Sequence, residues 1–263
     1  MITLTSDFGT PYPAAMKGVL LSRTSAQLVD VAHDLPRQDP RAAAFWLRET
    51  VPYFPPAVHL AVVDPGVGTD RRAIVIRVGE HALVGPDNGL LRPVGRRLVE
   101  SVPADSEEPP VACFEISVDD PASTTFHGRD VFAPAAAEIH EHGIDRLGRL
   151  ELLSPTRLDS CVDLQFPTPT VDGETVRGEV LVVDDFGNVI TNIPGDRLAG
   201  LDDVSVDGEP VPVVETFGSV PPGERLLTVG SHGFVECDVN QGRGDRRFGL
   251  SVGDAVTLRL DAD

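Results

Sequence analysis

The spacing of hydrophobic and polar residues changes near residue 155, and this change divides the chain into two parts. In the first part, short apolar or β-branched runs alternate with stretches whose apolar residues recur at helical spacing. The predicted strands lie at 2–5, 27–31, 58–63, 73–78 and 82–84, and the predicted helices at 14–25, 39–50 and 129–142. The run at 58–63 is apolar except for His59, which is typical of a strand covered on both faces. Strands that alternate with helices favour an α/β domain with a mostly parallel sheet.

The second part lacks helical spacing. Residues 154–170 contain three prolines and predict a linker or loop, which we assign to 156–169. Beyond it, turn dipeptides such as Asp172-Gly173 and Asp207-Gly208 separate short strand-like segments. These predicted strands lie at 177–183, 189–191, 211–216, 225–228, 233–239 and 255–260. We therefore expect an α/β domain over residues 1–155 and an all-β domain, without helices, over residues 170–263.

The charge balance excludes several classes of partner. The chain carries 41 acidic and 22 basic residues, a formal net charge of −19. Nucleic acids and anionic membranes are recognised by clustered lysine and arginine, so we expect neither as a partner. The sequence has no apolar run long enough to span a membrane, and we expect no signal peptide. Its three cysteines lie far apart and form no metal-binding pair, which favours a reducing, cytoplasmic setting without a metal site.

The choice of basic residues is unusual, because Lys17 is the only lysine and arginine supplies the others. So acidic a surface repels itself in dilute buffer, whereas molar salt screens the repulsion because the Debye length falls to about 3 Å. We interpret the composition as adaptation to a salty cytoplasm, the alternative being an acidic protein of an ordinary cytoplasm. The thermal unfolding midpoint should therefore rise between low and molar salt. A midpoint that stays level or falls would contradict this interpretation.

Acidic residues follow two of the predicted strands, and ligands of open α/β sheets bind beyond the carboxyl ends of strands. Asp7 follows the first strand, where it could accept two hydrogen bonds from a ribose diol or cap the next helix. Asp64 follows the buried run at 58–63 and opens a loop rich in glycine. A carboxylate there needs a cation, and Arg71 and Arg72 are the nearest in sequence. The pair could serve chemistry or only fasten the loop.

Two further clusters lie in the same domain. Asn88 belongs to the segment Gly85-Pro86-Asp87-Asn88-Gly89, which is also an ordinary turn sequence. His127 comes just before Gly128 and Arg129 at the predicted start of a helix. A neutral imidazole there could position or deprotonate a water molecule, although a lone histidine more often has a structural role.

The β domain contributes the segment Asp184-Asp185-Phe186-Gly187-Asn188. Phe186 could stack on a purine and Asn188 could hydrogen-bond to it, or the segment could be a strand turn with a buried phenylalanine. Ser231 and Asn240 lie in two more polar segments, at 230–234 and 240–242.

Taken together, these clusters resemble the S-adenosylmethionine hydroxide adenosyltransferase family, the S-adenosylmethionine hydrolases related to the fluorinases and chlorinases. The most specific match is Val-Val-Asp-Pro-Gly-Val-Gly-Thr at 62–69, followed by Phe-His-Gly-Arg-Asp at 126–130. The matching segments run in family order over 2–9, 16–19, 62–72, 85–91, 125–134, 184–192 and 231–242.

The resemblance implies an N-terminal α/β domain, a barrel-like C-terminal β domain and a homotrimer. In this family, S-adenosylmethionine lies between the N-terminal domain of one subunit and the C-terminal domain of the next. Water or hydroxide attacks the ribose C5′ and expels methionine, so that the products are adenosine and methionine. The implied catalytic set is Asp64, Arg71 and His127, and no metal or other cofactor is required.

The resemblance also implies a set of substrate contacts. The implied residues are Asp7 and Asn88 for the ribose diol, Phe186, Asn188, Phe217 and Asn240 for the adenine, and Asp184 and Ser231 for the amino and carboxylate groups of the methionine part.

Two alternative functions remain open at this stage. The first is a halogenase of the same family, although the halogenases lack the acidic residue and the histidine that match Asp64 and His127. The second is a protein that binds S-adenosylmethionine or adenosine without catalysis. One segment departs from the family pattern, because Thr10–Ala15 is shorter and lacks an acidic residue, although Tyr12 is retained.

Overall fold

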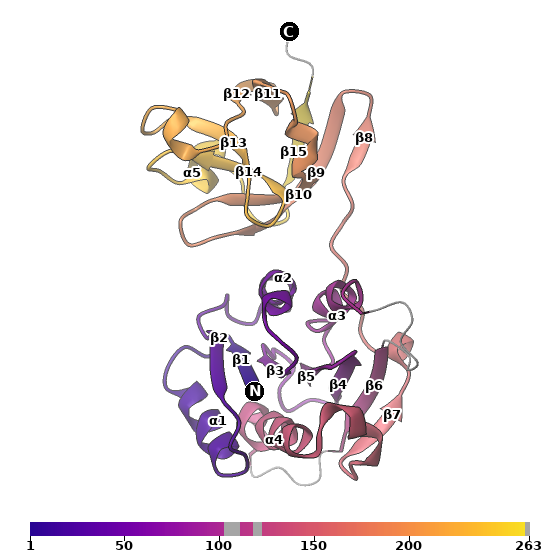
Figure 1. Ribbon diagram of the computed structural model, residues 1–263. Coiled ribbons are helices and arrows are strands. Elements are labelled where there is room, and N and C mark those ends of the chain that lie inside the picture. Colours follow the sequence, from indigo (N-terminus) through magenta and orange to yellow (C-terminus); the bar gives the residue numbers. More distant parts are fainter. Residues whose placement is uncertain (103–110, 118–122, 261–263) are drawn as a thin grey trace. The chain divides into compact units, whose positions relative to one another are not determined.

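The computed structural model describes residues 1–102, 111–117 and 123–260, and Figure 1 shows their arrangement. The chain forms two compact units, Met1–Gln165 and Phe166–Asp263, and the division falls within the linker expected at 156–169. Each unit has its own sheet and its own hydrophobic core. Within the described residues, none of the helices is both long and apolar enough to cross a membrane.

A seven-stranded sheet in the order β2-β1-β3-β5-β4-β6-β7 forms the centre of the first unit. Strands β2, β1, β3 and β5 are mutually parallel, whereas β4 and β7 run antiparallel to their neighbours. The mostly parallel sheet expected from the sequence is therefore confirmed. The strands span β1 (Ile2–Ser6), β2 (Leu28–Ala32), β3 (Val58–Val62), β4 (Ala73–Val78), β5 (His81–Pro86), β6 (Val111–Ile116) and β7 (Leu153–Thr156).

Helices cover both faces of this sheet, α1 and α4 on one face and α2 and α3 on the other (Figure 1). The α-helices span α1 (Tyr12–Leu21), α2 (Pro40–Thr50), α3 (Arg92–Val99) and α4 (Ala133–His142). A π-helical turn, η2 (Gly128–Phe132), leads directly into α4. Shorter 3-10 turns span η1 (Val51–Tyr53), η3 (Ile144–Arg149) and η4 (Leu158–Ser160).

Local sequence explains why α2 begins and ends where it does. The Asp39 carboxylate accepts hydrogen bonds from the backbone N–H groups of Arg41 and Ala42, each at 3.0 Å. These bonds satisfy donors that have no partner within the helix, and Pro40 needs no such bond. Val51 and the next residue, a proline, continue into the 3-10 turn η1. The α2 bounds expected from the sequence are confirmed.

Burial of β1 and β3 positions the functional loops. All five residues of each strand are buried, and both strands contribute to the main core beneath α1 and α4. Because β1, β3 and β5 are parallel, their carboxyl ends meet at one edge of the sheet. The segments that begin at Asp7, Asp64 and Asp87 leave the sheet at that edge.

The second unit is an antiparallel sheet in the order β12-β11-β15-β9-β10-β14-β13, with β8 paired to β9. A bridge between Val213 and Leu227, with Val214 N–H donating to Leu227 O at 2.9 Å, links its two ends. The barrel-like β domain is thereby confirmed. Its strands span β8 (Thr170–Asp172), β9 (Thr175–Val183), β10 (Val189–Pro194), β11 (Asp203–Val206), β12 (Glu209–Pro212), β13 (Arg225–Val229), β14 (Phe234–Val239) and β15 (Ala255–Arg259).

Several elements differ from the expectation. The second unit contains a short helix, α5 (Gly244–Phe248), so the expectation of no helix there was wrong. Its five residues are too few to show helical spacing. Residues 154–156, expected at the start of a loop, belong instead to the edge strand β7, which pairs with β6. The turns η5 (Gly195–Leu198) and η6 (Phe217–Ser219), and the elements α3, β6, β8 and β11, were also not expected.

Candidate active site

Asp64 lies just beyond the carboxyl end of β3, where the buried strand opens into a tight turn. The N–H of Val67 donates to Asp64 O at 3.3 Å, and Gly68 has a φ of +77° that favours glycine. A Cβ at Gly68 would lie only 2.8 Å from Thr124 O, so glycine allows the two loops to approach closely. The Asp64 side chain is only 4% exposed, so its charge requires a partner.

Arg71 is that partner, and its guanidinium contacts the Asp64 carboxylate through a bidentate pair of hydrogen bonds. Its Nε donates to Asp64 Oδ1 at 3.1 Å and its Nη2 to Asp64 Oδ2 at 2.5 Å. The guanidinium also stacks over the Phe132 ring, with Cζ 5.2 Å from the centroid. Bidentate guanidinium–carboxylate pairs fix orientation as well as charge. The Asp64 carboxylate is therefore held in one orientation.

His127 completes a chain of three side chains. Arg71 Nη2 donates to His127 Nδ1 at 3.1 Å, across 56 residues of sequence. Because arginine can only donate, Nδ1 must accept, and the neutral ring carries its proton on Nε2. Burial lowers the pKa of His127, the nearby Arg71 charge lowers it further, and Asp64 and Asp130 oppose the shift. The neutral ring is thus the favoured state near neutral pH.

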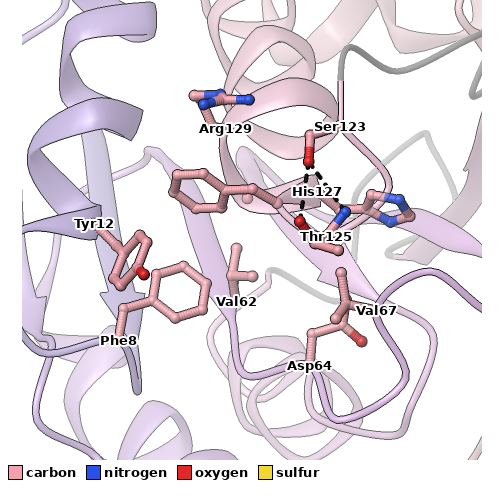
Figure 2. Close-up of a pocket in the computed structure, with 11 residues that line it drawn as sticks. Phe8, Tyr12, Val62, Asp64, Val67, Ser123, Thr125, His127 and Arg129 are labelled. Atoms are coloured by element: carbon pink, nitrogen blue, oxygen red, sulfur yellow. Dashed lines mark hydrogen bonds between the residues drawn. The ribbon is translucent and has the colours of Figure 1, made fainter.

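A pocket of about 460 Å³ opens beside these residues, and Figure 2 shows its lining. The rings of Phe8 and Tyr12 lie on one side, and Asp64 and His127 lie on the other. The Phe8, Tyr12 and Phe126 rings meet edge to face, with centroids 5.5–6.3 Å apart. One wall is thus aromatic and apolar, and the other carries a fixed carboxylate and a neutral imidazole. Such a division suits a ligand with an apolar part and one polar reacting centre.

Asp7 and Asn88, the residues expected at the ribose, lie in the segments that follow β1 and β5, with β3 between these two strands. Asp7 is buried, and its Oδ2 accepts a hydrogen bond from Gln38 N–H at 2.7 Å. The Asn88 amide donates to Val63 O, directly after β3, at 2.8 Å and accepts from Leu90 N–H in its own turn at 3.2 Å. The Asn88 amide therefore stabilises the turn, while the Asp7 carboxylate keeps lone pairs to accept further bonds.

Arg72, the other cation near Asp64 in sequence, has a different partner. Its Nε and Nη2 donate to Asp87 Oδ2 at 2.9 and 2.6 Å, and Nη2 also donates to Ser160 O at 2.7 Å. Arg71 and Arg72 thus form two separate ion pairs, and the pair with Arg71 is the one beside the pocket.

The candidates of the second unit lie in three of its turns and beyond β14. The Asp184 carboxylate accepts from Asn188 N–H at 2.8 Å and Nδ2 at 3.0 Å, which closes the β9–β10 turn. Phe186 at the tip of that turn is 79% exposed, so it is not the buried residue of the alternative interpretation. Of the remaining candidates, Phe217 lies in η6, Ser231 precedes β14, and Asn240 follows β14, donating to Val220 O at 2.7 Å.

Sequence reasoning missed part of the pocket wall. Phe8 and Phe126 lie beside the predicted residues in the chain, but nothing in their spacing shows that they meet. Arg129 lies over the Phe126 ring at 5.2 Å and pairs with Asp130 through Nε at 2.6 Å. Gly128 allows this packing, since a Cβ there would lie 3.1–3.2 Å from Phe8, Met16 and Phe126.

Comparison with known proteins identifies relatives over nearly the whole chain. Two sequence profiles match, the SAM hydroxide adenosyltransferase N-terminal domain over residues 2–148 and the C-terminal domain over residues 178–257. A protein of Salinispora tropica named (R)-S-adenosyl-L-methionine hydrolase is 40% identical, covering 98% of this chain and 97% of the relative. A protein of the same name from Thermus thermophilus is 42% identical, covering 96% and 97%.

Solved structures agree with the sequence relatives. A crystal structure of an uncharacterized conserved protein from Thermotoga maritima superposes with a TM-score of 0.83 at 33% identity, covering 98% of this chain and all of that one. A conserved hypothetical protein from Thermus thermophilus gives a TM-score of 0.75 at 38% identity, with 99% of both chains covered. Both domain profiles, the identity over the full length and the shared fold lead to one conclusion: the chain belongs to the SAM hydroxide adenosyltransferase family.

Proposed function

We propose that this protein hydrolyses S-adenosyl-L-methionine to adenosine and L-methionine. A water oxygen attacks the ribose C5′, the C5′–O bond forms, and the C5′–S bond breaks. The electron pair of that bond goes to the sulfur, so the sulfonium leaves as neutral methionine, and the attacking water loses a proton. Sulfonium is already a good leaving group, so the protein has to align and activate the water rather than protonate the leaving group.

The observation that carries this proposal is the contact of Asp64, Arg71 and His127 at the wall of the pocket. If the ion pair of Asp64 and Arg71 only fastened the loop, it would need neither a histidine beside it nor an adjoining cavity. A carboxylate fixed by a bidentate arginine is suited to orient a water for in-line attack. The same carboxylate repels halide ions, which disfavours the halogenase alternative.

The hydrogen-bond directions favour Asp64 over His127 as the proton acceptor. His127 accepts from Arg71 at Nδ1 and carries a proton on Nε2, so in this arrangement it can donate to a water but cannot take its proton. Asp64 keeps lone pairs beyond the two that Arg71 uses. Bulk water has a pKa near 15.7, so partial proton withdrawal by Asp64 in the transition state costs less than free hydroxide. Asp64 is therefore the proton acceptor, and His127 positions the water.

The remaining contacts follow the family resemblance. In this proposal Asp7 holds the ribose diol, and Asn88 supports the loop next to it. The adenine faces Phe186, Asn188, Phe217 and Asn240, and the methionine end faces Asp184 and Ser231. The exposed ring of Phe186 supports the adenine assignment, because an aromatic side chain left in solvent is suited to stack on a base.

The proposed enzyme is a cytoplasmic homotrimer with active sites shared between subunits. The catalytic candidates lie in Met1–Gln165 and the adenine and methionine candidates in Phe166–Asp263. Mixing two inactive variants, one with Asp64→Asn and one with Phe186→Ala, should therefore restore part of the activity, because some mixed trimers carry an intact site. Each variant mixed with itself is the control. A stable monomer with full turnover would contradict the shared site.

The acid limb of the pH profile should report His127. Protonation would place a second cation beside Arg71 and put a proton on Nδ1, which breaks the contact between them. Because burial and Arg71 hold the pKa of His127 below the ordinary value of about 6.5, turnover should stay level from neutral pH to below 6.5 and fall only beneath it. The measurement is kcat against pH, with NMR titration of the ring assigned through a His127→Gln variant. A half-drop above pH 6.5 would contradict the assignment.

The direct test is to incubate the purified protein with S-adenosyl-L-methionine in ¹⁸O-labelled water and molar chloride, and to identify the products. Adenosine carrying one ¹⁸O on its 5′-hydroxyl, together with unlabelled methionine, is the expected result. A 5′-chloro-5′-deoxyadenosine product would favour the halogenase alternative. Saturable binding with unchanged substrate would favour the non-catalytic alternative. Labelled homoserine together with 5′-methylthioadenosine would place the attack on the methionine carbon bonded to sulfur, rather than on C5′.

A further inference from the structure

A second hydrogen-bonded network of side chains lies at the carboxyl end of β1, and it is separate from the set formed by Asp64, Arg71 and His127. Lys17 on α1 donates from Nζ to Asp30 Oδ2 at 2.5 Å. Asp30 Oδ1 lies 3.0 Å from His33 Nε2, and His33 Nδ1 lies 2.7 Å from Ser6 Oγ. Three elements, α1, β2 and β1, are thus joined, and the only lysine of the protein stands at the outer end.

The two charged side chains of this network, Lys17 and Asp30, fix which partner donates in each of their hydrogen bonds. Lysine can only donate, and an ionised carboxylate can only accept. Burial raises the pKa of Asp30, but the bonds from Lys17 and His33 outweigh it and lower the pKa overall, which favours the carboxylate. His33 therefore donates from Nε2, and its Nδ1 is hydrogen-bonded to the Ser6 hydroxyl. The Ser6 oxygen in turn accepts from Phe8 N–H at 3.5 Å.

The order serine, histidine, aspartate is also that of nucleophilic hydrolases, but burial excludes this role here. Ser6 is 0% exposed, and it is not among the residues that line the described pocket. A nucleophilic hydroxyl must reach within about 3–3.5 Å of its target, and no substrate can approach Ser6 so closely. The arrangement can hold the backbone but cannot attack a ligand.

The backbone that it holds carries Asp7. Ser6 directly precedes Asp7, and His33 O accepts from Gly9 N–H at 2.7 Å, so His33 binds the chain on both sides of Asp7. The Asp7 carboxylate itself accepts from Gln38 N–H, in the loop that follows His33. Loss of the Ser6–His33 bond would free the β1–α1 loop, and with it Asp7 and the Phe8 ring that lines the pocket.

We propose that Lys17, Asp30 and His33 act through Ser6 as positioning residues that orient Asp7 to bind the ribose hydroxyls of the substrate. The inference rests on the proposed function, because it takes Asp7 as the residue that holds the diol. It adds four residues that touch no reacting atom and act only through the loop. Their effect must therefore depend on whether the ligand carries the two hydroxyl groups.

Ligands with and without the diol provide the test. Affinities for adenosine and for 2′,3′-dideoxyadenosine are measured by calorimetry on the full-length protein carrying Ser6→Ala. The variant should weaken adenosine binding about tenfold and change dideoxyadenosine binding by less than about twofold. With S-adenosylmethionine, KM should rise by a similar factor while kcat changes much less.

Thr3→Val is the matched control. Thr3 lies on the same strand, and its hydroxyl bonds to a histidine in the same way, 2.8 Å from His59 Nδ1, but it lies away from the Asp7 loop. Both variants lose one buried hydroxyl contact, so a merely structural role would lower their thermal midpoints alike and leave ligand preference unchanged. Thr3→Val should leave the ratio of the two affinities at the parental value.

Lys17→Met removes the outermost side chain of the network. Lys17 is only half-buried, so its loss does not put folding at risk. It should reduce the preference for adenosine in the same direction as Ser6→Ala, and Lys17→Arg should restore it. Equal weakening of both ligands by Ser6→Ala and no effect of Lys17→Met would overturn the inference. Asp7→Ala separates the two proposals: if it removes the preference for the diol and the Ser6 and Lys17 variants do not, only the positioning role fails. If Asp7→Ala leaves the preference intact, the ribose assignment itself fails.

Discussion

Replacing Asp64 by asparagine should lower the rate of single-turnover hydrolysis about 10²–10⁴-fold, which corresponds to roughly 3–5 kcal/mol of barrier. The amide keeps the size of the side chain but loses the charge that withdraws the proton from water. It also offers Arg71 one acceptor oxygen in place of the two it now contacts. Substrate affinity should change far less, because the proposed adenine and methionine contacts lie on other residues.

The chain offers a matched control for this variant. Asp87 is also a buried carboxylate at the end of a strand, and it pairs with an arginine, Arg72, which donates twice to its Oδ2. Asp87 does not line the described pocket, so Asp87→Asn should cost stability but change the hydrolysis rate only a few-fold. If Asp64→Asn hydrolyses at the parental rate, or if both variants lose the same activity, the nucleophile is not activated by Asp64.

Where local sequence decides a structure, the sequence predicts it. The bounds of α2 follow from a capping aspartate and a proline, and those of β4 from an apolar run that only Arg77 interrupts. Helix α3 was not predicted, because Pro93, Gly95 and three arginines interrupt its apolar spacing. Its support comes from far along the chain, since Arg92 and Arg96 donate to Asp163 Oδ1 at 3.0 and 2.7 Å. No local pattern contains such a contact.

The residues of the candidate site also fall into two groups, those that local sequence identifies and those that depend on contacts between distant segments. Residue type and position beyond a buried strand were enough to single out Asp64, and the start of a helix to single out His127. Spacing alone left Arg71 and Arg72 open, and only the family resemblance pointed to Arg71, because the choice depends on which side of the β4 entry each side chain leaves. Arg72 O accepts the N–H of Asp87 in line with the β4–β5 ladder, which directs its side chain to the Asp87 carboxylate. Arg71, one residue earlier, is left to reach Asp64 and His127.

Arg71 should matter as much for stability as for catalysis. Arg71→Ala removes the cation from an aspartate whose side chain is 4% exposed, and breaking a buried pair from one side costs about 3–5 kcal/mol. The freed carboxylate can rotate or take up a proton, and His127 loses the donor that fixes its ring. We therefore expect a large fall in the unfolding midpoint together with a loss of hydrolysis of about 10²-fold or more.

A double variant separates these two effects. Asp64→Asn together with Arg71→Met removes both charges, and the methionine side chain keeps a packing contact with the Phe132 ring. Neutral partners leave no buried charge uncompensated, so most of the stability lost in Arg71→Ala should return. Activity should not return, and its loss should be close to that of the worse single variant, because the three side chains act as one unit. The measurements are denaturant unfolding in molar salt and single-turnover hydrolysis on the same preparations. If the double variant recovers activity along with stability, Arg71 serves the fold alone. If its losses are the product of the two single losses, the two residues act independently and do not form one catalytic unit.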